Sequence, residues 1–184
     1  RRYAGGLDDP ARMASAFAGV TVGNLQDNAI IIRGNSPKGV SWRLEGVEIP
    51  NPNHFAGGNV AGGGFATVFS SQLLSNSDFY TGAFPSEYGN ALAGVFDMKL
   101  RNGNNEKRES TFQIGVMGID FASEGPFRKG GNASYLFNYR YSTLSLVSAM
   151  GLIPSTQVPK YQDLSFKLNF PTKKAGIFSV WGIG

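Results

Sequence analysis

A strict two-residue alternation in the second half of the chain constrains the fold more than any other feature. From residue 133 to residue 142, an alanine and then four aromatic side chains occupy every second position, and mostly polar side chains lie between them. The aromatic positions are Tyr135, Phe137, Tyr139 and Tyr141. Residues 164–170 alternate in the same way. A period of two places the two sets on opposite faces of a β-strand, so both segments are predicted to be strands.

The connections between these strands alternate in length. Turn residues cluster at 126–131 and 171–176, whereas 142–160 is a long connection. Residues 111–121 alternate less cleanly, and 175–184 are ambiguous by period. Strands of about ten residues joined alternately by short turns and long loops are typical of a transmembrane β-barrel. A soluble β-sandwich is the competing interpretation, but four aromatic residues on one side of a single strand favour the barrel, because aromatic rings gather at headgroup depth.

The first part of the chain, up to residue 105, has a different texture of short elements and glycine-rich loops. A helix of about ten residues is predicted after Asp8-Asp9-Pro10, ending at Gly19. The further predictions are strands at 29–34, 40–49, 77–80 and 93–101, a glycine-rich loop at 57–64 and a second helix at 65–74. The chain is therefore expected to contain two domains, 1–105 and 106–184.

Composition excludes several classes of function. The chain has no cysteine and a single histidine, His54, so a thiolate site, a dedicated transition-metal site and a hydrolytic triad have no support. No apolar run is long enough for a membrane helix. The net charge of +4 comes entirely from the residues after 104 and is scattered near turns, which does not indicate a nucleic-acid partner. Neither a cofactor nor a metal is predicted.

Four short segments carry a family resemblance when they are taken in order, together with the predicted first helix. Residues 28–34 end in Arg33-Gly34, and residues 42–50 contain Glu45-Gly46 followed by valine. Residues 77–85 and 87–98 follow, the latter with Gly89 in a glycine-rich turn before a strand. This succession resembles the plug domain of TonB-dependent outer-membrane receptors over about residues 7–104. Glu45 stands where the family usually has aspartate, a style similar to receptors that carry a carboxypeptidase-regulatory-like N-terminal domain.

The resemblance implies an α+β plug, with a small mixed sheet and short helices, followed by antiparallel β-strands of a truncated transmembrane β-barrel. The plug is expected to be incomplete at its N-terminus, and the barrel to stop after about four of the family's 22 strands. The implied function is part of an outer-membrane receptor of a Gram-negative bacterium, for TonB-energised uptake of a scarce solute, without enzymatic activity. The alternatives are a soluble β-rich binding or adhesion module and a hydrolase dependent on His54.

The implied partners are the remainder of the receptor barrel, the TonB complex of the inner membrane, a surface lipoprotein and outer-membrane lipid. The segment that contacts TonB is not visible in this chain. The resemblance also suggests site residues. Substrate-facing plug loops are assigned to Asn51, Asn53, His54 and Phe55. Structural or gating roles in the plug are assigned to Arg33, Gly34, Glu45, Gly46 and Gly89. Arg33 is expected to pair with Glu45, Glu48 or the inner barrel wall, or else to be a solvated strand-end arginine.

Overall fold

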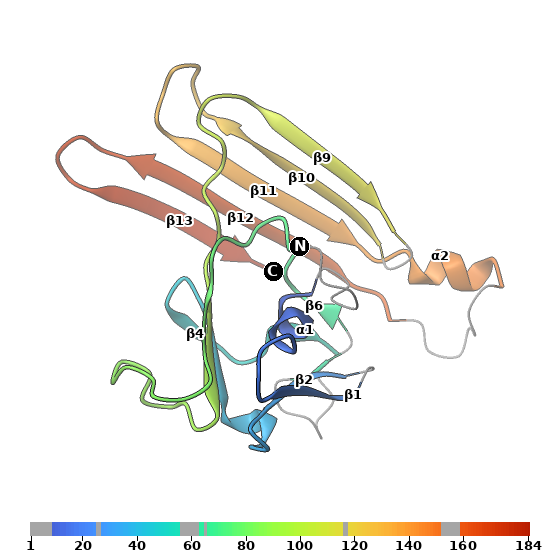
Figure 1. The fold of residues 1–184 in the computed structure, drawn as a ribbon. Coiled ribbons are helices and arrows are strands. Elements are labelled where there is room, and N and C mark those ends of the chain that lie inside the picture. The colour runs from blue at the N-terminus through green and yellow to red at the C-terminus, as the bar shows by residue number, and fades with distance from the viewer. Residues whose placement is uncertain (1–8, 25–26, 56–62, 65, 116–117, 152–158) are drawn as a thin grey trace. The chain divides into compact units, whose positions relative to one another are not determined.

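The computed structural model describes residues 9–24, 27–55, 63–64, 66–115, 118–151 and 159–184 (Figure 1). The chain divides into two compact units, Arg1–Leu100 and Arg101–Gly184. The two domains expected at 1–105 and 106–184 stay a prediction. The glycine-rich loop predicted at 57–64 falls mostly outside the described residues.

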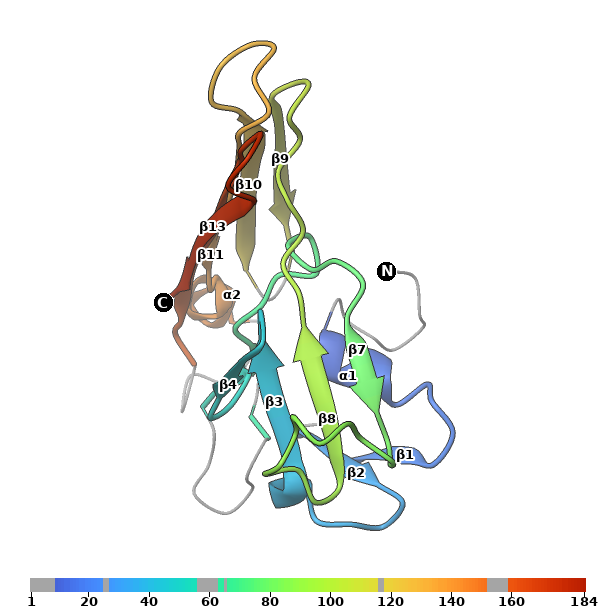
Figure 2. The ribbon, with the colours of Figure 1, turned by 90° about the vertical axis from the view of Figure 1, so that its left-hand side faces the viewer.

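The first unit is built on a four-stranded mixed sheet, shown in Figure 2. Its strands, in the order β4-β3-β8-β7, are β4 (Val47–Ile49), β3 (Val40–Leu44), β8 (Gly94–Met98) and β7 (Asp78–Tyr80). β3 and β8 are parallel, and the outer pairs are antiparallel. All five residues of β8 are buried, as expected for a strand covered on both faces. The single strand predicted at 40–49 is wrong, because the chain reverses between β3 and β4.

Smaller elements complete the first unit. Two short hairpins pair β1 (Val20–Asn24) with β2 (Asp27–Ile32) and β5 (Asn53–His54) with β6 (Ala66–Thr67). The helices are α1 (Pro10–Ala14) and the 3₁₀ turn η1 (Pro37–Gly39). No helix in the described ranges is long and apolar enough to cross a membrane.

Both predicted helices of the first unit need correction. α1 begins as expected, with the amide of Arg12 donating to the Asp9 side chain at 3.4 Å, but it ends at Ala14 rather than Gly19. Beyond it, the amides of residues 15–17 bond to carbonyls three residues back, which tightens the chain into turns. The helix predicted at 65–74 is wrong: the described residues form β6 and turns, with Phe69 and Leu73 buried in the core. Phe69 and Leu73 are spaced as on a helix face because each is buried by a separate turn of the chain.

The second unit is an antiparallel sheet of five strands in sequence order, seen in Figure 1. The strands are β9 (Glu109–Ile114), β10 (Ile119–Pro126), β11 (Ser134–Tyr141), β12 (Gln162–Pro171) and β13 (Ile177–Ile183). The segment 111–121 is therefore not one strand but parts of two, so five strands replace the four expected. The long connection carries α2 (Leu144–Ala149). The expected fold class, a mixed sheet with short helices followed by antiparallel strands, is confirmed.

Candidate functional site

The dipeptides Arg33-Gly34 and Glu45-Gly46 are the central residues of two tight turns. All four have positive φ, at 51° and 78° for the first pair and 52° and 80° for the second. The residues flanking each pair face one another in antiparallel pairing. Two successive left-handed residues are the requirement of a type I′ hairpin turn. Glycine meets it without strain, whereas arginine and glutamate are held there at a cost.

The side chain of Glu45 explains why a non-glycine residue stands in the second turn. Its Oε1 accepts a hydrogen bond from the amide of Leu100 at 2.6 Å, and its own amide donates to the carbonyl of Met98 at 2.9 Å. The turn is thereby tied to the chain just beyond β8. A carboxylate acceptor on a backbone amide makes a strong hydrogen bond, so the Glu45 side chain joins this turn to the backbone at Leu100.

Arg33 does not make the ion pair that was expected within the first unit. The described residues show no salt bridge from Arg33 to Glu45 or Glu48. Its side chain is exposed and runs over two glycines: a Cβ built on Gly19 or Gly82 would lie 3.4 Å from Arg33 atoms. The expectations left for Arg33 are a carboxylate of the inner barrel wall as its partner, or a solvated side chain.

The predicted substrate-facing residues cluster around the β5–β6 hairpin, but they differ in what they do there. Asn51 accepts from the amide of Asn53 at 2.9 Å and donates to the carbonyl of Gly63 at 3.0 Å, bridging the base of the hairpin. Asn53 is buried. Phe55 is 50% exposed, and its ring lies 5.9 Å from that of the half-buried His54. Asn51 and Asn53 therefore shape the loop, while His54 and Phe55 present surface.

A polar group that sequence reasoning missed lies on the central sheet. The guanidinium of Arg43 lies 5.1 Å from the ring centre of Tyr88, and the Tyr88 hydroxyl donates to Oδ2 of the buried Asp97 at 3.4 Å. Burial, and then the negative charge of Asp97, raise the pKa of Tyr88. Among the described residues, the other oxygen of Asp97, Oδ1, has no hydrogen-bond partner. Only the parallel pairing of β3 with β8, which places Arg43 beside Asp97, brings the group together.

Gly89, also predicted to have a structural or gating role, has no local requirement for glycine. Its φ is outside the left-handed region, and an added Cβ would meet nothing within 4 Å. Its assigned role stays a prediction.

All the charged residues within the five strands of the second unit lie on one face of the sheet. The cross-strand register and the two-residue period place them together. They are Glu109, Asp120, Glu124, Arg140, Asp163 and Lys167. The same face carries Asn138, Ser165 and Asn169, each of them buried.

Two carboxylates on this face have polar partners on adjacent strands. Nε of Arg140 donates to the carboxylate of Asp163 at 3.1 Å, and the Asn138 amide donates to Asp120. Arg140 and Asp163 also form an ion pair. Such pairing is what makes a charge tolerable in a poorly hydrated place.

The opposite face of the sheet is apolar and more exposed. It carries the aromatic positions of β11 and the alternate leucines and phenylalanines of β12. Large side chains here are open to the surroundings, among them Phe112 at 62% and Val180 at 52% exposed. A water-soluble sheet exposes its polar face, so this sheet is inverted. The arrangement suits strands whose outer surface meets lipid.

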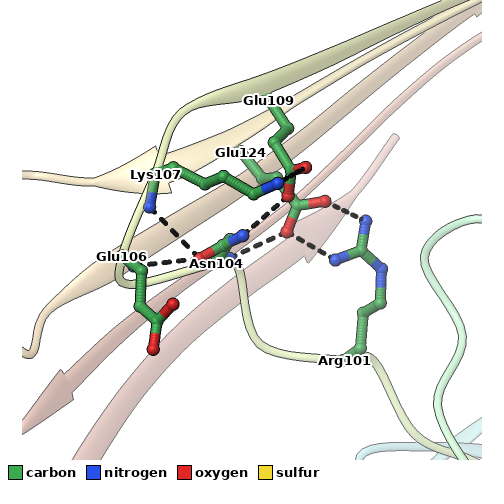
Figure 3. Close-up of polar contacts among 6 residues, drawn as sticks. All are labelled: Arg101, Asn104, Glu106, Lys107, Glu109 and Glu124. Atoms are coloured by element: carbon green, nitrogen blue, oxygen red, sulfur yellow. Dashed lines mark hydrogen bonds and ion pairs between the residues drawn. The ribbon is translucent and has the colours of Figure 1, made fainter.

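The connector at residues 101–107 is clamped to the polar face, as Figure 3 shows. Arg101 donates to both carboxylate oxygens of Glu124, at 2.6 and 2.7 Å, and the Asn104 amide donates to the same carboxylate at 2.8 Å. The Asn104 side chain donates to Glu109 at 2.6 Å, and Lys107 pairs with Glu109 at 2.8 Å. The carboxylates of Glu124 and Glu109 thus contact the connector at residues 101, 104 and 107.

Gly103 lies at the tightest point of this contact. A Cβ built there would lie 1.9 Å from the carbonyl oxygen of Tyr135 on β11, so only glycine lets the connector backbone approach the strand. No pattern in the sequence indicated this position, because a single glycine among polar residues looks like an ordinary loop.

Comparison with known proteins supports a receptor-like fold. No protein-family profile and no curated protein matches the sequence. Among solved structures, one mutant of the ferric enterobactin receptor of Pseudomonas aeruginosa is similar over 96% of this chain, with a TM-score of 0.60 and 12% identity. A second mutant of that receptor aligns over 96% of the chain, with a TM-score of 0.49 and 14% identity.

The first likeness establishes the class of architecture: a mixed-sheet domain followed by antiparallel strands, as in part of that receptor. At 12% identity it concerns the fold alone. The chain spans 30% of the length of that ferric enterobactin receptor.

Proposed function

We propose that this chain is part of an outer-membrane receptor for TonB-energised uptake of a scarce solute in a Gram-negative bacterium. Residues 1–105 act as the plug and residues 106–184 as the first strands of the barrel wall. The observation that carries the proposal is the inverted sheet, with all its strand charges on one face and exposed apolar side chains on the other. The receptor-like fold supports it.

In this proposal the polar face of β9–β13 is the inner wall and the apolar face meets outer-membrane lipid. Closing the wall requires the remainder of the barrel, since an open sheet edge leaves backbone groups unpaired in lipid. His54 and Phe55 face the solute, on a loop shaped by Asn51 and Asn53. Arg33 pairs with a carboxylate of the inner wall, and its turn with Gly34, like that of Glu45-Gly46, keeps the plug in shape. Gly89 belongs to the segment that adjusts when the plug moves.

The chemistry required is binding and displacement. The solute binds at the outer face, and the TonB complex of the inner membrane then remodels the plug to open a path. A surface lipoprotein that delivers solute is a further proposed partner. No covalent step on the solute is needed, so catalysis has no part in the proposal.

Adjacent residues of β9 provide a sharp test. Phe112 and Gln113 are both exposed but lie on opposite faces, and the chain has no cysteine of its own. Phe112→Cys and Gln113→Cys variants of the whole receptor that contains this chain are reconstituted into phospholipid vesicles and treated with a water-soluble maleimide, with the unsubstituted receptor as the blank. We expect Gln113→Cys to react and Phe112→Cys to be protected, with both reacting once the protein is denatured.

The competing soluble module predicts a different outcome. A chain that folds as a monomer in water, and in which both cysteines react equally with or without vesicles, would contradict the membrane assignment. Both positions are exposed in the structure. A difference between them in vesicles therefore reports burial in lipid and not burial within the protein.

A further inference from the structure

The two short turns of the second unit carry a concentration of positive charge. The turn between β10 and β11 contains Arg128 and Lys129, and the turn between β12 and β13 contains Lys173 and Lys174. All four side chains are exposed. Neither turn, at 127–133 or at 172–176, contains an acidic residue. In the described part of the chain, none of the four makes a salt bridge.

These turns lie together at one end of the sheet (Figure 1). Phe127, in the first turn, stacks on Phe170 at the end of β12, with ring centres 5.3 Å apart and planes 14° from parallel. Tyr135 lies against the same Phe127 ring at 5.7 Å. The turns that carry the four cations therefore also border an aromatic cluster at the edge of the apolar face.

The neighbouring carboxylates do not neutralise the turn cations. The connector and the start of the sheet at this end contain three cations and three carboxylates, whose charges cancel. They are Arg101, Lys107, Arg108, Glu106, Glu109 and Glu124. Glu124 and Glu109 are occupied by Arg101, Asn104 and Lys107. The four turn cations therefore leave this end with a net positive charge.

The loops at the opposite end of the sheet carry almost no charge, and the charged strand residues there are Asp120, Arg140 and Asp163. The connections at 115–118 and 142–161 contain a single charged residue, Lys160. The sheet is consequently polarised along its strands, with cations beside aromatic rings at one end and a nearly neutral, largely apolar loop at the other.

We infer that the two turns form a docking surface for anionic phospholipid headgroups, in the leaflet at the short-turn end of the strands. This inference rests on the proposed function, because the strands must span a bilayer. Aromatic rings at the border of an apolar face sit at headgroup depth, and lysine and arginine beyond them extend toward the phosphates. A nucleic acid fits less well, since the cations border an apolar aromatic face.

Spin-labelled lipids test the inference on the whole receptor that contains this chain. The protein is reconstituted into vesicles of phosphatidylcholine mixed with phosphatidylglycerol, and its relative association with spin-labelled forms of the two lipids is measured. The Lys173→Gln/Lys174→Gln variant is compared with Lys38→Gln/Lys160→Gln, whose net charge is the same and whose lysines are also exposed but lie outside the two turns. Circular dichroism checks that both variants fold.

We expect the unmodified chain to prefer phosphatidylglycerol, and Lys173→Gln/Lys174→Gln to lose that preference by on the order of fivefold for each cation. The control should keep it, and added salt should weaken it. Equal association with both lipids, or an equal loss in the two variants, would overturn the inference. So would complete displacement of labelled phosphatidylglycerol by soluble glycerol phosphate or by an oligonucleotide. Failure to enter vesicles of any composition would instead overturn the proposed function, and this inference with it.

Discussion

Arg101 and Glu124 form a two-pronged ion pair, with both terminal guanidinium nitrogens within 2.7 Å of carboxylate oxygens. The Asn104 amide shares the same carboxylate. One side chain of β10 therefore fixes two points of the connector, three residues apart. The pair is largely shielded, with side chains 28% and 15% exposed, so water competes little for either partner.

Replacing Arg101 by leucine should destabilise the second unit, because the Glu124 carboxylate is left shielded and without its cation. We expect a loss of about 1–3 kcal/mol in the free energy of unfolding, measured by denaturant titration in detergent. The stability of Arg101→Lys should lie between that of the unmodified chain and that of Arg101→Leu, since lysine keeps the charge but cannot donate two parallel hydrogen bonds to the carboxylate. Lys107→Gln is the control: its pair with Glu109 is exposed, and no measurable change is expected. Equal stabilities of Arg101→Leu and Lys107→Gln would refute the clamp.

The close approach of Gly103 to β11 predicts intolerance of any side chain. A methyl group at Gly103 would collide with the Tyr135 carbonyl oxygen, and relief requires the connector to shift. Gly103→Ala should cost about 1–3 kcal/mol, whereas Gly89→Ala, with open space around it, should leave stability unchanged. The same unfolding titration compares the two. If Gly103→Ala unfolds at the wild-type midpoint, the connector does not pack on β11 as described.

The strands of the second unit were predictable where one short-range rule decides them. In β11 and β12 the two-residue period of aromatic and polar side chains fixes both strand and face, and no distant contact is needed. The segment 111–121 failed because Gly115 and Gly118 mark a reversal inside a pattern that still alternates approximately. Turn chemistry, not hydrophobic period, decides that boundary.

The first unit was harder to predict because its elements are defined by distant contacts. Nothing local shows that Glu45 turns the chain, since glutamate rarely adopts positive φ and its compensation comes from Leu100, fifty-five residues later. The same holds for Asp97 and Arg43, which meet only through a parallel pairing. The family resemblance located the dipeptides Arg33-Gly34 and Glu45-Gly46, but it did not show that each forms a tight turn.

Arg33 allows stability and function to be separated. Its backbone has φ of 51° in a two-residue turn with Gly34, a position that asparagine occupies more easily than arginine. Arg33→Asn should therefore raise the stability of the first unit by a few tenths to about 1 kcal/mol. If the Arg33 charge serves transport, solute uptake by the whole receptor carrying this change should fall while the unfolding midpoint rises. Reduced stability would show that the side chain holds the turn; unchanged uptake would remove its proposed role.

Tyr88 predicts a specific loss of stability at alkaline pH. Burial, together with the nearby charge of Asp97, keeps the pKa of Tyr88 in the folded state above its ordinary value of about 10. The neutral phenol is thus favoured by folding, and its stabilising contribution is complete below pH 10 and lost as pH rises through the raised pKa. Tyr88→Phe cannot ionise, so its free energy of unfolding should decline less steeply in that window.

The alkaline experiment needs the difference between the two proteins, because Tyr88 is not alone in titrating there. A hydrogen bond to Asp78 raises the pKa of Lys99, whose contribution is lost in the same direction. Lys99 is present in both proteins, so its part largely cancels when the wild-type and Tyr88→Phe curves are subtracted. Parallel curves above pH 10 would mean that Tyr88 ionises as freely in the folded unit as in the unfolded chain, and that the group formed with Arg43 and Asp97 does not shield it.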